Sequence, residues 1–278
     1  MSAEYVPARP PAALRGHVLR YLGYREHSPD PVRRRQPPAA GVALILGAHP
    51  IALSGPGVGT ASATAFAGGL GDTWVLTEFT GPQAGVQVDL TPAAAFTLLG
   101  GRALPGGAVP RLDELDDTAL AALPDRLAAA PTWSHRFALV TDLLATRLLD
   151  ARARRPDPEV LHAWSRFEAS GGTVPVGVVA AETGWSRRHL QDRFRTQTGI
   201  APVTARRVLR FGRAAALVGA GTPLAGVAAG CGYTDQAHLT REFRALAGIT
   251  PGAFRAERAA GFPSVQDLTP PTGQDRAS

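Results

Sequence analysis

The sequence contains an internal repeat that limits the folds open to its second half. Residues 184–202 (GWSRRHLQDRFRTQTGIAP) and 232–251 (GYTDQAHLTREFRALAGITP) both begin with a glycine–aromatic–hydroxyl triplet, and the two triplets lie 48 residues apart. The later anchors recur 49 residues apart, because the second copy contains one inserted residue: Leu190 and Leu239, Phe194 and Phe243, Gly199 and Gly248, and Pro202 and Pro251. So many matched positions indicate one supersecondary unit that is used twice.

Each copy has the parts of two short helices joined by a tight turn. In the first copy the alanine-rich residues 176–182 precede Gly184, a residue suited to such a turn, and Ser186 is a good N-cap for the next helix. In the second copy either Thr234 or Asp235 serves as the N-cap. Leucine and phenylalanine four residues apart predict a buried stripe on the second helix of each copy. These parts together are typical of a helix-turn-helix unit.

The opposite face of each second helix is polar and predicts a surface that reads nucleic acid. Arginine bonds guanine O6 and N7 in bidentate fashion, and glutamine does the same with adenine N6 and N7. The candidate DNA-binding residues are Arg187, Arg188, Gln191 and Arg195 in the first copy, and Gln236, His238, Thr240, Arg241 and Arg244 in the second. Residues 202–218 read as one connecting helix of about 25 Å. A rod of that size could hold two reading helices roughly one DNA turn apart.

The distribution of charge supports a polyanionic partner for the repeated half. Residues 151–260 hold 16 arginines and 8 acidic residues, a net charge of +8. Residues 1–150 hold 12 arginines and 13 acidic residues, a net charge of −1. A basic module beside a nearly neutral one is the electrostatic pattern expected of a nucleic-acid-binding domain.

Residues from about 157 to 258 resemble the DNA-binding domain of AraC/XylS-type transcription regulators. The resemblance is carried by GWSRRHLQDRF, CGYTDQAHLTREFR and GITPGAFR, and by four linker arginines, Arg206, Arg207, Arg210 and Arg213. It implies two helix-turn-helix subdomains, joined by a linker helix, that bind adjacent major-groove segments of double-stranded DNA. Asp192 departs from the pattern, since some family members carry a basic or polar residue there. An acid at that position would repel phosphate or accept from cytosine N4.

The first hundred residues predict short strands, and helices follow them. The strand-like runs are 42–46, 72–81 and 85–90, bounded by glycine and proline clusters, and Pro92 opens a short apolar helix. An amphipathic helix is expected over 133–154, after part of a shorter one at 125–130. This half is similar to sensor domains of the same regulators in actinobacteria, which implies a cupin-like barrel followed by helices that pair two subunits. Small-molecule binding and a homodimer are therefore expectations from the resemblance alone.

The predicted fold class is α+β with two domains. Residues 1–155 form the sensor and dimerisation domain, which is β-rich over 1–100 and helical over 112–155. Residues 156–260 form the all-α DNA-binding domain, and the proline-containing residues 261–278 are expected to be a disordered tail. The arginine- and proline-rich stretch 151–158 marks the boundary between the two domains.

Other classes of protein find little support in the sequence. One cysteine excludes a disulfide framework and multi-cysteine metal sites, and the start has no signal-peptide pattern. No apolar run reaches membrane-spanning length, so a cytoplasmic location is expected. His17, His27 and His49 show no metal-ligand spacing, and Cys231 between two glycines fits a small buried residue better than a redox sensor. We predict no metal and no cofactor.

The prediction is therefore a sequence-specific DNA-binding regulator, activator or repressor, with no catalytic residues. Its expected partners are double-stranded DNA, a small-molecule effector whose binding residues are unknown, RNA polymerase and a second copy of the chain. The alternative is an enzyme or small-ligand-binding barrel that carries a DNA-binding appendage. No nucleophile–base pair, spaced carboxylate pair or phosphate loop favours the enzyme.

Overall fold

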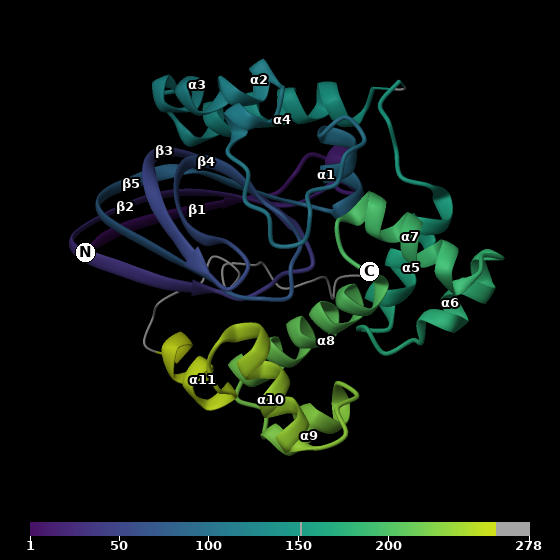
Figure 1. Cartoon of the computed structure of the whole chain (residues 1–278). Coiled ribbons are helices and arrows are strands. Elements are labelled where there is room, and N and C mark those ends of the chain that lie inside the picture. The colour runs from purple at the N-terminus through teal and green to yellow at the C-terminus, as the bar shows by residue number, and fades with distance from the viewer. Residues whose placement is uncertain (151, 260–278) are drawn as a thin grey trace, which may run out of the picture.

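The computed structural model describes residues 1–150 and 152–259, in which a β-sheet region precedes a set of helices. The expected tail, 261–278, lies outside these residues. The five strands of the sheet are β1 (Ser2–Ala8), β2 (Val18–Gln36), β3 (Val42–Gly55), β4 (Gly59–Gly68) and β5 (Val75–Leu90). The sheet is antiparallel in the order β1-β2-β5-β3-β4. Figure 1 shows it as a strongly curled layer.

The predicted α+β class is confirmed, although the sheet is open rather than a closed barrel. The edge strands β1 and β4 each pair with a single neighbour in the described part of the chain. The two runs expected at 72–81 and 85–90 are one strand, β5, whose Gly81 has a φ of 81°. The chain continues through this left-handed conformation because glycine has no Cβ that would clash.

Three strands were not predicted: β1, the long β2 and β4. Proline cannot donate to a sheet ladder, and Pro29 and Pro31 make residues 18–36 look unlike one strand. The structure places both prolines where the register between β2 and β5 shifts, between Ser28 and Val32. The ladder is interrupted there, so the missing N–H groups cost no sheet hydrogen bond.

Helices cover one face of the sheet (Figure 1). These are α1 (Pro92–Leu98), α2 (Thr118–Ala121), α3 (Leu123–Ala129) and α4 (Trp133–Leu148), with short 3-10 turns at Ala12–Leu14 and Leu112–Glu114. The ring of Tyr21 stacks on Phe137 of α4 at 6.0 Å. Helix α4 ends six residues before the predicted 154, and the Arg155 guanidinium donates to the carbonyl of its last residue, Leu148.

The opposite face of the sheet is polar although it is buried. Side chains alternate along a strand, so Arg20 and Leu22 point away from the helices that Tyr21 contacts. The buried polar residues of this face are Arg20, Glu26, Arg34, Gln83 and Gln87. Arg34 donates twice to Glu26, at 2.8 and 2.5 Å, and the pair is therefore internally neutral.

The second half is all helical, as predicted. Its helices are α5 (Pro158–Ala169), α6 (Val176–Thr183), α7 (Arg187–Thr198), α8 (Pro202–Gly219), α9 (Leu224–Gly230), α10 (Gln236–Ala247) and α11 (Pro251–Ala259). The connecting helix predicted for 202–218 is α8, one residue longer. No helix in the described ranges is long and apolar enough to cross a bilayer.

Two large apolar clusters organise the chain. One runs from the sheet and α4 through α5, α6 and α7 to Ala205 at the start of α8. The other begins at Phe211 in the same helix and includes α9, α10 and α11. The proposed boundary at 155/156 therefore lies within the first cluster, and the division into two domains stays a prediction.

Replacing Phe243 with alanine should destabilise the second cluster by about 3–5 kcal/mol, because it leaves a cavity in a packed core. Phe243 is fully buried, and its ring lies 5.0 Å from that of Phe211 and 5.1 Å from that of Phe254. Urea unfolding measures the loss. The control, Val203→Ala, changes a side chain that is 64% exposed and should shift stability by no more than about 0.5 kcal/mol. Equal stability of the two variants would contradict this packing.

Candidate nucleic-acid interface

The first copy of the repeat folds as the sequence predicts. Helix α6 ends at Gly184, whose φ of 71° is the left-handed conformation that glycine adopts without strain. The Ser186 hydroxyl accepts from the His189 amide at 3.2 Å and so starts α7. Leu190 and Phe194 are fully buried, with Phe194 edge-on to Phe167 at 5.7 Å. Tertiary packing and capping therefore fix which face of α7 points outward.

The second copy repeats this geometry with one change at the turn. Gly232 has a φ of 72°, and Asp235 rather than Thr234 caps α10, accepting from the His238 amide at 2.6 Å. The inserted residue therefore lies in the turn and leaves α10 unchanged. Leu239 and Phe243 are fully buried, as Leu190 and Phe194 are.

The predicted DNA-binding residues lie on the outward faces of α7 and α10, seven of them exposed and two half-buried. The exposed ones are Arg187, Arg188, Gln191 and Arg195 on α7, and Gln236, Arg241 and Arg244 on α10. His238 and Thr240 are half-buried. The His238 ring packs edge-on against Tyr233, and its Nδ1 lies 3.3 Å from both the amide and the hydroxyl of Thr234. His238 is thus held by its own turn before any partner binds.

Three of the four linker arginines make contacts inside the protein. Arg206 donates to the carbonyls of Gly172 and Thr173, and so holds α8 to the loop before α6. Arg207 and Arg210 donate to Glu242 of α10, at 2.7 and 3.0 Å. These side chains fix α8 against both copies of the repeat, and they are not part of the outward face.

Glu242 is ionised at neutral pH because of this pairing. Burial alone would raise the pKa of its carboxyl, but hydrogen bonds and charge from Arg210 and Arg207 outweigh burial and lower the pKa. Arg210 also stacks over Tyr233 at 4.8 Å. Burial raises the pKa of that tyrosine to about 12. Tyr233 is 5% exposed and belongs to the second apolar cluster.

The sequence-based interpretation missed a polar contact that ties α5 to α6. Glu182 accepts from Arg166 through both carboxylate oxygens, at 2.8 Å each, and lies 3.0 Å from the His162 ring. These hydrogen bonds lower the pKa of Glu182 to about 2. The partners stand 16 and 20 residues apart in different helices, and no local pattern indicates such a pairing.

The remaining candidates from the sequence do not form a site. His17, His27 and His49 belong to no group of three or more histidine, cysteine or acidic side chains that could hold a metal, within residues 1–150 and 152–259. Cys231 is fully buried, and burial raises the pKa of its thiol. A raised pKa disfavours the reactive thiolate, in line with a structural role.

Two capped helix-turn-helix units with basic outward faces define a DNA-binding protein. A family model described as a helix-turn-helix domain matches residues 179–257. The DNA-binding domain of the global transcriptional factor AdpA, solved with a target DNA, is 30% identical; the match covers 39% of this chain and 99% of that one, with a TM-score of 0.35. The chain belongs to the AraC-type family, and it is a DNA-binding transcription regulator.

Two other solved structures share less of their sequence with this chain. An AraC-type regulator from Chromobacterium violaceum is 28% identical over 37% of this chain and 95% of that one, with a TM-score of 0.35. ToxT from Vibrio cholerae O395 is 10% identical over 91% of this chain and 97% of that one, with a TM-score of 0.48. No curated protein matches the chain in sequence.

Replacing Asp235 with alanine should destabilise the second unit by about 1 kcal/mol, because the first turn of α10 loses its N-cap acceptor. Guanidinium unfolding monitored by circular dichroism measures the change. The matched control is Asp192→Ala on α7, since that acid is exposed and caps no helix. A stability change for Asp235→Ala no larger than that of the control would show that the cap is not needed.

Proposed function

We propose that α7 and α10 insert into two successive major-groove segments of one DNA site and read base sequence there. The observation that carries this proposal is the duplication: two outward faces, each with arginine and glutamine, are joined by a single helix, α8, of 18 residues. At 1.5 Å per residue α8 is about 27 Å long. That length suits two reading helices separated by roughly one turn of DNA, about 34 Å.

The outward residues divide into two roles by their chemistry. Gln191 and Gln236 carry no charge, so their contribution is base reading, with adenine as the preferred partner. Arg195 and Arg244 lie further along their helices and suit phosphate contacts. The complete proposed set is Arg187, Arg188, Gln191, Arg195, Gln236, His238, Thr240, Arg241 and Arg244. Because the proposed partner is DNA, we also propose that the protein is located in the cytoplasm.

We further propose that the N-terminal half receives a small-molecule effector. Support comes from the polar buried face of the sheet, where Arg20 pairs with Asp89 but leaves its Nη1 buried without a partner. Buried polar atoms without partners are costly, and a bound ligand would satisfy them. A gel shift on DNA from the protein's own promoter region, together with thermal shifts induced by metabolites, tests both halves of the proposal.

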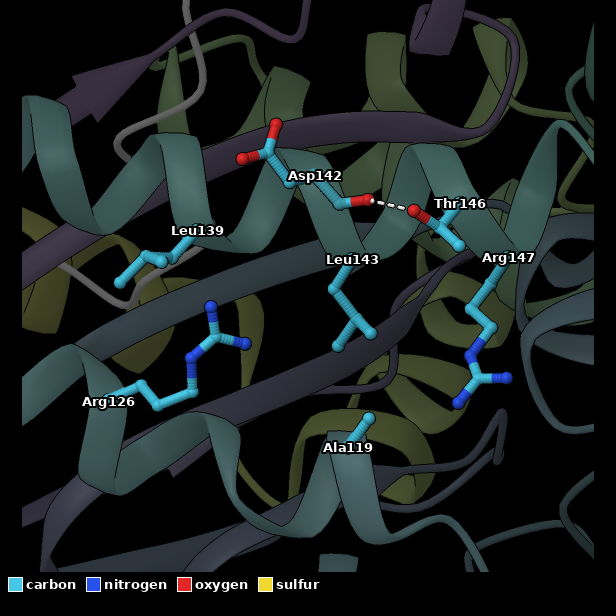
Figure 2. A pocket seen from close by; sticks show the side chains of 7 residues that line it. All are labelled: Ala119, Arg126, Leu139, Asp142, Leu143, Thr146 and Arg147. Carbon is cyan, nitrogen blue, oxygen red and sulfur yellow. Dashed lines mark hydrogen bonds between the residues drawn. The ribbon is translucent and has the colours of Figure 1, made fainter.

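A second copy of the chain is the proposed partner for the groove between α2, α3 and α4. The groove has a volume of about 410 Å³ and contains Ala119, Arg126, Leu139, Asp142, Leu143, Thr146 and Arg147. Figure 2 shows Leu139 and Leu143 pointing from α4 toward the side of Arg126 and Ala119. Arg126 and Asp142 form no ion pair within the described residues, and in such a dimer Arg126 of one copy pairs with Asp142 of the other.

Replacing Leu143 with arginine should convert such a dimer to monomers, because a charge would be buried at the centre of the interface. Sedimentation velocity at several protein concentrations measures the mass. Leu149→Arg is the matched control, since Leu149 is 44% exposed and lies outside the groove. A wild-type chain that stays monomeric at every concentration, or a Leu149→Arg variant that dissociates equally, would argue against this interface.

Replacing Gln236 with alanine should relax preference at one or two base pairs, at about 1–3 kcal/mol, and leave the salt dependence of binding unchanged. Arg244→Ala should instead weaken binding to all sequences alike and reduce the salt slope by about 1, because one phosphate contact is lost. Fluorescence anisotropy at several salt concentrations measures both variants, and each is the control for the other.

A binding constant unaffected by salt between about 50 and 200 mM would contradict phosphate contact altogether. A footprint confined to one groove segment, with Gln236→Ala silent, would assign the second unit another partner, such as RNA polymerase.

A further inference from the structure

The N-terminal half contacts both copies of the repeat at the same position. That position is the glycine that ends each recognition helix, Gly199 after α7 and Gly248 after α10, and these two residues lie 49 apart in the repeat. Both have a positive φ, of 86° and 72°. The equivalence matters because a contact made twice at matched positions constrains the two units relative to each other.

At Gly199 the contact is made by backbone. A Cβ built on Gly199 would lie 1.8 Å from the Leu104 carbonyl oxygen, so the loop after α1 passes directly over the end of α7. The next residue, Ile200, is 5% exposed, and its Cγ2 would lie 3.1 Å from a Cβ on Gly106. Leu104 and Ile200 belong to the same apolar cluster. This end of the contact is close-packed.

At Gly248 the contact is made by a stacked pair of side chains. A Cβ built there would lie 2.4 Å from the Trp74 indole nitrogen and 2.6 Å from Arg35 Nη1. The Arg35 guanidinium stacks over the Trp74 ring at 4.4 Å. A cation at the C-terminus of a helix interacts favourably with the helix dipole, so Arg35 also stabilises the position of α10 electrostatically.

A third contact joins the same region to the connecting helix. Asp72, two residues before Trp74, accepts from Arg207 of α8 at 3.0 Å, and Arg207 also donates to Glu242 of α10. One short loop of the N-terminal half thus reaches α8 and the end of α10 together. In Figure 1 the sheet lies along α8, with α7 toward one end of that helix and α10 toward the other.

The three contacts leave the proposed reading surface free. Two of them involve the C-terminal ends of α7 and α10 and the third involves α8, whereas Arg187, Arg188 and Gln236 occupy the N-terminal turns of the recognition helices, which are exposed. The N-terminal half is therefore placed to set the relative position of the two recognition helices without covering them.

We propose that the N-terminal half is a brace that fixes the spacing of α7 and α10 through Gly199, Gly248 and Arg207. Releasing the contact at Trp74 and Asp72 lets the second unit move as far as α8 allows. The spacing between the two groove segments that the protein accepts is then less restricted. This consequence for DNA rests on the function proposed above, whereas the brace itself does not.

The experiment measures the brace directly in the full chain. In a Cys231→Ala background, spin labels are attached at Ala48→Cys in β3 and Ala229→Cys in α9, two exposed positions outside the contacts. Pulsed electron paramagnetic resonance then gives the distribution of distances between them. We expect one narrow distribution for the background protein and a broad one after Trp74→Ala or Asp72→Asn. The control, Asp113→Asn, removes an ion pair with Arg111 inside the N-terminal half and should leave the distribution narrow.

A second measurement uses a duplex selected by the wild-type chain from random DNA, and versions with 2 or 5 base pairs inserted between the protected segments. The inserted base pairs should lower the affinity of the wild-type chain for the duplex. This loss should be smaller by about fivefold or more in Trp74→Ala, because about fivefold is the lower end of couplings between linked sites. Distributions as narrow as the background in both variants would overturn the brace. Broad distributions with an unchanged loss of affinity would show that α8 alone sets the spacing. Broad distributions in a protein that binds no DNA would refute the proposed function and leave the brace standing.

Discussion

The amphipathic helix α8 is the element on which the rest of the structure depends. Ala205 near its start belongs to the cluster that includes the first helix-turn-helix unit, and Phe211, Ala214 and Val218 belong to the core of the second. One rod therefore supplies side chains to two hydrophobic cores. Helix α8 therefore couples the two units, because neither core can form without its part of the helix.

Three of the four arginines of α8 make contacts inside the protein and do not contribute to a DNA-binding surface. Arginines that would suit phosphates are turned inward, where Arg207 and Arg210 share Glu242. Because Arg207 also pairs with Asp72, the two guanidinium groups face two carboxylates and leave no net charge of their own. Within residues 1–150 and 152–259 the exposed arginines of α7 and α10 form no ion pair, so positive charge available to a polyanion lies on the two recognition helices.

The two faces of the N-terminal sheet carry different kinds of side chain. Apolar side chains such as Tyr21 and Val88 pack against helices, while Arg20 and Glu26 are buried on the other side. The alternation is visible in the sequence only where a strand has already been identified. It was obscured in β2 because Pro29 and Pro31 fall within it, and the bulge that accommodates them depends on the partner strand β5.

The sequence by itself determined the repeated units: their helices, the glycine turns, the caps and the buried leucine–phenylalanine pairs follow from local spacing and hydrophobic period. It also determined that α8 is one helix and that the outward faces are basic. Only the tertiary structure decided the strand order, the open sheet, the choice of Asp235 over Thr234 as cap, and the pairing of Glu182 with Arg166. It alone brought Leu104 to Gly199 and Trp74 to Gly248. These contacts join residues far apart in the chain, and their geometry is set by how whole elements pack, which no local pattern encodes.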